Sequence, residues 1–371
     1  MPDVYLDFNA STPIAPEVRD AMLPYLETAY GNPSSTHWAG RAAREVVEKA
    51  REQVAGLLGC SAGEVVFTGG GTEANNHALK GAFYANGASG HIITTAVEHP
   101  AVIEPCRFLE RIGAEVTVVP VDSNGRVDPG DIEAAIRPDT IVVSVMHANN
   151  EVGTIQPIRE IARVCRPAEV LFHTDAAQSV GKIATRVDEL GVDLLSIAAH
   201  KFYGPKGVGA LYIREGVALE PLMHGAGHEG GRRAGTENVL LDAGLGAAAT
   251  LAKDLAPAKR MLELREHFWR RLREEFGDGV VLNGHPEHRL PNTLNVSFTG
   301  RVGADILAAM PEVAATTGSA CHSGAVKMSP VLAAMGTPEV VAAGAIRFSL
   351  GRMTTVEEIE HVSNRLVRVV S

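Results

Sequence analysis

Short runs rich in valine, isoleucine, leucine and threonine alternate with longer segments of helical periodicity over the first two-thirds of the chain. Several of the short runs are apolar on both faces, which is typical of strands covered by helices on each side. The alternation predicts an α/β fold whose sheet is mainly parallel and has helical crossovers. The predicted strands span residues 64–68, 91–96, 115–120, 140–146, 170–174, 193–197 and 209–214.

The pattern changes in the last third of the chain. Residues 254–276 place large apolar side chains near one face of a long helix, and a strand is predicted over residues 293–298. We therefore predict a large domain over residues 13–253 and a smaller α+β domain over residues 254–371, which the N-terminal segment 1–12 joins. Both lengths lie within the normal range for domains.

Composition and charge restrict the class of protein. Of the 371 residues, 45% are hydrophobic and 21% are charged, which is typical of folded globular proteins. The net charge of −10 disfavours direct binding to nucleic acid. No apolar stretch approaches the roughly 20 residues of a membrane span, and the first residues lack the pattern of a signal peptide, so we expect a cytoplasmic protein without membrane attachment. The four cysteines form no C-x-x-C pair, so neither a metal site nor a disulfide scaffold is expected.

Polar side chains follow five of the predicted strands, at the point where each strand ends. Ligands of open α/β sheets bind beyond the carboxyl ends of the strands, so we expect these side chains to share one site. The candidate segments are residues 69–72, 98–99, 147–150, 175–178 and 200–201.

Each feature also has a plain structural interpretation. Taken singly, glycines 69–71 fit a tight turn, His99 a loop, Asp175 a helix cap and Lys201 a solvated surface lysine. With Thr72 at a helix start, however, the glycines also form an anion site, because free N–H groups and the helix dipole favour phosphate. The loop matches neither a Walker motif nor the spaced-glycine dinucleotide fingerprint, which disfavours ATP and NAD.

A phosphate-binding loop, a carboxylate, an amide, an imidazole and a lysine are together the groups that hold pyridoxal phosphate. The sequence resembles the cysteine desulfurase family of fold-type I pyridoxal-phosphate enzymes and their close relatives, the selenocysteine lyases. The resemblance covers nearly the whole chain and implies a large domain with a mainly parallel seven-stranded sheet. The matching stretches are residues 5–10, 31–35, 67–76, 97–99, 149–153, 173–178, 200–209, 233–238, 291–293, 318–324 and 347–352.

The resemblance implies chemical roles for the side chains at the strand ends. Lys201 matches the lysine that forms a Schiff base with the cofactor and then moves the Cα proton of the substrate. Asp175 matches the carboxylate that faces the pyridine nitrogen. Gln178 matches the amide that contacts the phenolic oxygen, and His99 the imidazole stacked on the ring.

The resemblance also implies contacts to the phosphate and to the substrate. Asn149 and Arg347 match the pair that binds the substrate carboxylate, a task that suits the planar guanidinium, and Asn149 is also expected to contact the cofactor. Thr236 matches a threonine that reaches the phosphate of the neighbouring subunit, which implies a homodimer. Phosphate contacts within the chain are implied for Gly71, Thr72 and His200.

Cys321 lies among glycine and small residues, which predict a mobile loop. In the family this cysteine attacks the substrate sulfur as a thiolate and becomes a persulfide. The sulfur then passes to an acceptor or scaffold protein for iron–sulfur cluster, thiamine or transfer-RNA chemistry. The neighbouring His322 fits either a role in deprotonating the thiol or a solvent-exposed position. The other cysteines, Cys60, Cys106 and Cys165, are interpreted as packing residues.

Two departures from the family pattern leave the substrate open. Ala198 replaces a serine that often binds the phosphate, and residues 320–323 resemble the lyases, although the compact stretch that follows resembles the desulfurases. We interpret the chain as a pyridoxal-phosphate-dependent cysteine desulfurase that converts L-cysteine to L-alanine. The alternatives are a lyase acting on L-selenocysteine and a catalytically idle cofactor-binding partner protein.

Overall fold

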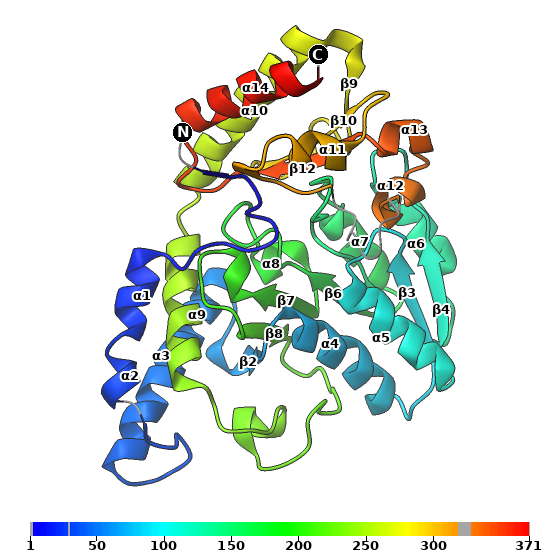
Figure 1. Ribbon diagram of the computed structural model, residues 1–371. Helices are drawn as coiled ribbons and strands as arrows, with labels where there is room; N and C mark the ends of the chain where they lie inside the picture. Colours follow the sequence, from blue (N-terminus) through cyan, green and yellow to red (C-terminus); the bar gives the residue numbers. More distant parts are fainter. Residues whose placement is uncertain (1–2, 29, 318–327, 371) are drawn as a thin grey trace.

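The computed structural model describes residues 3–28, 30–317 and 328–370. Figure 1 shows a large layered α/β part with a smaller part packed at one end of it. Within the described residues, seven strands form the sheet of the large part, in the order β2-β8-β7-β6-β5-β3-β4. Strand β8 is antiparallel to both neighbours, and the other neighbouring strands are parallel. The strands are β2 (Val65–Thr68), β3 (His91–Thr95), β4 (Glu115–Val119), β5 (Thr140–Ser144), β6 (Leu171–Asp175), β7 (Leu194–Ala198) and β8 (Gly209–Ile213).

The predicted α/β class, the mainly parallel sheet and all seven predicted strands are confirmed, with strand ends that shift by one or two residues. Strands β2 and β7 run in the same direction because each is antiparallel to β8, which lies between them. The carboxyl ends of β2, β3, β5, β6 and β7 therefore meet at one edge of the sheet. This edge is where the sequence places its candidate site residues.

Side chains of each strand alternate between two helical layers. Val65 and Phe67 pack in the cluster that contains α3 and α9, whereas Val66 packs against Ala74 and Ala78 of α4. None of the described helices is long and apolar enough to cross a membrane. One face is covered by α4 (Gly71–Ala85) and α5 (Pro100–Arg111), and the other by α3 (Trp38–Leu58), α7 (Ile158–Cys165) and α9 (Val239–Ala252). Shorter helices of this part are α1 (Pro16–Met22), α2 (Tyr25–Thr28), α6 (Pro129–Ala135) and α8 (Val187–Leu190).

The smaller part contains an antiparallel sheet in the order β12-β10-β9. The predicted long helix begins at Ala256, two residues later than expected, and the Asp254 side chain accepts a hydrogen bond from the Ala256 N–H (2.9 Å) in the turn before the helix. The strands are β9 (Val280–Leu282), β10 (Thr293–Phe298), as predicted, and β12 (Ala345–Ser349). The helices are α10 (Ala256–Phe276), α11 (Gly303–Ala308), α12 (Pro330–Ala334), α13 (Glu339–Ala342) and α14 (Val356–Val370).

The N-terminal segment packs with the smaller part. Strand β1 (Val4–Tyr5) pairs in parallel with β11 (Val313–Ala314), and Val4 and Leu6 join the hydrophobic cluster of residues 264–370. The other large hydrophobic cluster draws its residues from 15–252. This division agrees with the expected organisation, although the domain boundaries themselves stay a prediction.

Candidate active site

A cavity of about 370 Å³ lies at the carboxyl edge of the central sheet. Most of the predicted site residues line this cavity, together with residues of the N-terminal segment and of β12. The predicted residues that line it are Gly71, Thr72, His99, Asp175, Gln178, His200, Lys201 and Arg347.

One end of the cavity is formed by the start of α4. The helix begins at Gly71, directly after the loop that follows β2, and its first N–H groups have no partner within the helix. Gly70 has a φ of 143°, which only glycine adopts readily. A Cβ placed on Gly71 would lie 3.2 Å from the Cβ of Ala198, so a side chain at position 71 would be crowded against Ala198. The end of the cavity is suited to a phosphate, and Ala198 offers it no hydroxyl.

Asp175 is the last residue of β6, and it is only 7% exposed. Its Oδ1 accepts a hydrogen bond from the Ala177 N–H (2.9 Å), and its Oδ2 accepts one from the Asn75 side chain (2.7 Å). Asn75 lies in the first turns of α4, and in the part of the chain that the structure describes its own Oδ1 is buried without a hydrogen-bond partner. These contacts fix the direction of the carboxylate in the cavity.

Lys201 ends a short 3₁₀ turn that follows β7. Its Nζ donates to the carbonyl oxygens of Asn9 (2.8 Å) and Ala10 (2.9 Å) in the N-terminal segment. Burial and the nearby Arg347 lower the pKa of this amine to about 8, although the negative charges of Asp175 and Asp7 act to raise it. A larger fraction of Lys201 is therefore uncharged, and thus nucleophilic, near neutral pH than for an ordinary lysine.

Two histidines line the cavity as neutral rings. His99 caps α5, and its Nδ1 accepts the Ala101 N–H (3.0 Å), which leaves the ring proton on Nε2. Burial lowers the pKa of His99, and Lys201 lowers it further. Burial and two nearby lysines lower the pKa of His200 to about 4.

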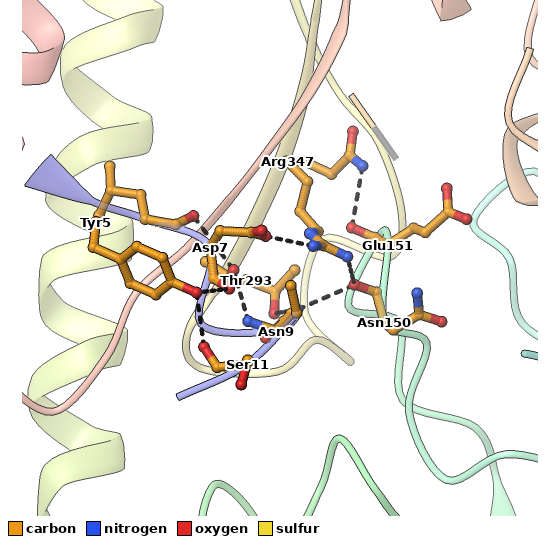
Figure 2. Close-up of polar contacts among 12 residues, drawn as sticks. Tyr5, Asp7, Asn9, Ser11, Asn150, Glu151, Thr293 and Arg347 are labelled. Atoms are coloured by element: carbon orange, nitrogen blue, oxygen red, sulfur yellow. Dashed lines mark hydrogen bonds and ion pairs between the residues drawn. The ribbon is translucent and has the colours of Figure 1, made fainter. Parts of the chain in front are cut away.

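Arg347 lies on β12 of the smaller part and lines the cavity, and Figure 2 shows its guanidinium beside Asp7 and Asn150. Its Nη2 forms an ion pair with Asp7 Oδ1 (2.6 Å), and its Nη1 donates to the Asn150 carbonyl oxygen (2.9 Å). The remaining Nε is buried and has no hydrogen-bond partner among the described residues. The guanidinium is thus held by the N-terminal segment and by the loop after β5.

Of the predicted residues that the structure describes, two do not line the cavity. Asn149 is 0% exposed, and its amide bonds to the Val97 carbonyl oxygen and to the N–H groups of residues 151 and 152. Its neighbour Asn150 lines the cavity instead. Thr236 is exposed at the surface, outside the cavity. Cys321 lies outside the described residues.

Several residues that form this site were not predicted from the sequence. Asn9, Asn75 and Asn150 line the cavity, and Asp7 pairs with Arg347. The three asparagines lie inside stretches that carry the family resemblance, and this position in the motifs was the sequence feature that could have identified them as site residues. Which asparagine of a pair faces the cavity depends on the fold and was not readable from the pattern.

The other cysteines have the environment of packing residues. Cys106 and Cys165 are buried, and Cys60 is partly buried. Burial raises the pKa of each of these three thiols to about 12, so they stay protonated at neutral pH. Protonated thiols are poor nucleophiles, which agrees with the structural interpretation.

Comparison with known proteins agrees with this geometry. The model of the family described as aminotransferase class-V matches residues 4–362. "Cysteine desulfurase IscS" of Dictyoglomus turgidum is 50% identical over 376 residues, covering 99% of this chain and 94% of that protein. The solved structure of a NifS-like protein superposes with a TM-score of 0.92 at 39% identity, covering 99% of both chains. The structure of SspA in complex with cysteine gives a TM-score of 0.85 at 37% identity, covering 95% of this chain and all of the other.

The central sheet, the lysine beside a carboxylate and the family match define an enzyme of the aminotransferase class-V type. Within this class, the chain belongs to the cysteine desulfurase family. The family predicted from the sequence and its fold-type I architecture are thereby confirmed.

Proposed function

We propose that the chain binds pyridoxal phosphate through Lys201 and converts L-cysteine to L-alanine, with transfer of the sulfur to Cys321. The single observation that carries this proposal is one cavity that contains the Lys201 amine, the Asp175 carboxylate and the free N–H groups at the start of α4. When bound, pyridoxal phosphate supplies an electron sink that allows the Cα proton of an amino acid to leave.

The cavity residues fit this cofactor. The start of α4, including Gly71 and Thr72, would bind the phosphate together with His200, and Thr236 of the neighbouring subunit would complete that site. Asp175, whose carboxylate is held by two hydrogen bonds, would serve the pyridine nitrogen. Gln178 would donate to the phenolic oxygen, and His99 would stack on the ring.

Arg347 binds the carboxylate of L-cysteine, because its buried Nε has a free N–H and its planar group binds carboxylates well. We assign the accompanying amide to Asn150, since the amide of Asn149 is fully engaged with the backbone. The uncharged Lys201 amine takes the Cα proton, a step that its lowered pKa favours.

The sulfur step involves Cys321 as a thiolate. Its Sγ attacks the Sγ of the substrate, so an S–S bond forms while the Cβ–Sγ bond of the substrate breaks. The electron pair of the broken bond stays on Cβ, which takes up a proton and becomes the methyl group of L-alanine. The enzyme is left with a persulfide at Cys321, which an acceptor or scaffold protein takes up for iron–sulfur cluster or thio-cofactor synthesis.

The variant Cys321→Ser tests this function. It should bind the cofactor, with borohydride fixing it to the peptide of Lys201, and yet lose alanine and sulfide production from L-cysteine, because a hydroxyl attacks sulfur far more slowly than a thiolate. Cys60→Ser, which changes a partly buried packing cysteine, is the matched control and should keep full turnover. Normal turnover by Cys321→Ser would refute the sulfur-transfer role. If this variant has lost L-cysteine turnover but turns over L-selenocysteine at a rate comparable to that of the wild type, selenium release is a side activity independent of Cys321.

We also propose that the enzyme is a homodimer in the cytoplasm. Leu23, Leu26, Tyr30 and Trp38 are exposed apolar side chains near the start of the large part, and Trp38 packs edge-on against Tyr30. Such side chains suit a surface between subunits, and the exposed Thr236 would serve the partner's phosphate site. Sedimentation that finds a fully active monomer would contradict the shared site.

A further inference from the structure

Lys182 is a buried lysine for which the proposed reaction has no use. It lies in the turns that follow β6, four residues after Gln178, and is only 8% exposed. In the described part of the chain it forms no ion pair with a carboxylate. The charged groups that act on it are Lys201 and Arg347, both positive, and together with burial they lower the pKa of Lys182 to about 7. A lysine buried at this cost calls for a specific role.

The contacts of Lys182 are directed at Gln178. The Nζ of Lys182 donates to Gln178 Oε1 (3.0 Å), and it lies 3.5 Å from Asn9 Oδ1. The amide nitrogen of Gln178 in turn donates to the Asn9 carbonyl oxygen (2.9 Å). Both ends of the glutamine amide therefore have partners of fixed polarity, and Gln178 itself lines the cavity.

These partners define the direction of the amide. A carbonyl oxygen can only accept, so the reversed amide would face the Asn9 oxygen with its own oxygen, and it would also lose the hydrogen bond that the Lys182 amine donates in either protonation state. In the observed direction Nε2 uses one hydrogen for Asn9 and has a second that is available to a group in the cavity, which Gln178 lines. Without Lys182, the oxygen end of Gln178 loses its partner, and only the contact of Nε2 with the Asn9 carbonyl oxygen still restrains the amide.

The acceptor Asn9 is itself well fixed. Its side chain donates to Thr293 Oγ1 (2.9 Å) and to the Asn150 carbonyl oxygen (3.1 Å), contacts that Figure 2 shows, and accepts from the Asn292 amide (3.0 Å). The Gln178 amide is thus clamped between a rigid carbonyl group and the Lys182 amine.

We propose that Lys182 is a positioning residue: it holds the Gln178 amide so that its second N–H donates to the phenolic oxygen of bound pyridoxal phosphate. This inference rests on the proposed function. A donor at this oxygen stabilises its ionised form, so it lowers the pH at which the bound cofactor loses its proton and changes colour. The loss of one such hydrogen bond is expected to raise this pH by up to roughly one unit.

The test is a pH titration of the absorbance of the holoenzyme. Lys182→Met, which keeps the length of the side chain but cannot donate, is expected to raise the midpoint by about one unit. Gln178→Leu is expected to raise it similarly, and Lys182→Met added to Gln178→Leu should cause no further shift, because the lysine acts through the glutamine. Lys206→Met, which removes an exposed positive charge near His200, is the control and should leave the midpoint unchanged.

Two results would overturn the proposal. An unchanged midpoint in Lys182→Met would show that the lysine does not hold Gln178. A shift that persists in the Gln178→Leu background would show that its charge acts directly on the cofactor. Lys182→Leu, equally unable to donate, replaces the methionine variant if that variant does not fold. Failure of the wild type to fix the cofactor at Lys201 would instead refute the proposed function, which keeps the two failures distinct.

Discussion

The two walls of the cavity differ in origin. The sheet wall contains Asp175 and Lys201, each of which comes at or just after the end of a strand of the central sheet. The closing wall contains Asn9 and Arg347, which come from the two ends of the chain. Behind this wall Arg347 pairs with Asp7, across 340 positions of the sequence. The sheet wall carries groups proposed for cofactor chemistry, and the closing wall carries Arg347, which is proposed for substrate recognition.

The two walls also differ in how their groups are held in place. Groups on the sheet wall are held by strands buried on both faces, so their positions are rigid. Groups on the closing wall are held by polar contacts between the N-terminal segment and the smaller part. Substitutions in the sheet wall should therefore reduce the rate of the chemical step, and substitutions in the closing wall should mainly weaken binding of the substrate.

The largest effect is expected for Asp175→Asn in the sheet wall. This change keeps the shape of the side chain but removes a charge from the proposed position beside the ring nitrogen. We expect kcat for alanine formation to fall by about 10²–10³-fold, the usual effect of losing one preorganised electrostatic group. The measurement is steady-state alanine production by the holoenzyme.

The matched control is Asp193→Asn, because Asp193 directly precedes β7, outside the cavity lining, and pairs with Arg214. This variant should turn over normally. Thermal melting should show that both variants are folded. Near-normal turnover in Asp175→Asn would show that the charge of Asp175 takes no part in the chemical step.

A smaller effect is expected for Arg347→Lys in the closing wall. The lysine keeps the charge but cannot bind a carboxylate with two parallel hydrogen bonds. We expect KM for L-cysteine to rise about tenfold to a hundredfold, as for the loss of one charge-assisted hydrogen bond, with a smaller change in kcat. Initial-rate kinetics over a range of cysteine concentrations measure both constants.

Arg365→Lys is the control for this prediction, since Arg365 forms a comparable ion pair with Glu312 in the smaller part. It should leave both constants unchanged. A fall in kcat at constant KM in Arg347→Lys would mean that the closing wall takes part in the chemical step, and would break the proposed division.

The smallest effect concerns the pH dependence of cofactor uptake. The pKa of Lys201 is lowered to about 8, and only the uncharged amine reacts with the aldehyde of the cofactor. The rate of uptake by cofactor-free protein should therefore rise about tenfold per pH unit below pH 8 and level off above it. Absorbance after mixing with pyridoxal phosphate follows the rate, and Lys201→Ala provides the baseline.

A rate that keeps rising through pH 9 and 10 would show an amine of ordinary pKa. Replacement of Arg347 by lysine retains a nearby positive charge and should preserve the midpoint. Arg347→Met should raise the midpoint, because the guanidinium is one of the groups that lower the pKa of Lys201. This comparison measures how far the closing wall acts electrostatically on the sheet wall.

The sequence alone determined the sheet wall. Runs of apolar residues define the buried strands, and the residues that follow a parallel strand necessarily lie at the carboxyl edge of the sheet. For this reason Gly71, Asp175 and Lys201 could be assigned to one site from their order along the chain. The same local logic predicted the seven strands to within two residues at each end.

Tertiary structure decided the closing wall and the roles of neighbouring amides. Asn149 and Asn150 are adjacent in the sequence, yet the first is engaged with the backbone and the second faces the cavity. The Asp7–Arg347 pair and the contact from Lys182 to Gln178 depend in the same way on where packed segments bring the side chains. Strand order follows from a repeating local pattern, whereas the direction of a single side chain depends on the packing of segments that lie far apart in the chain.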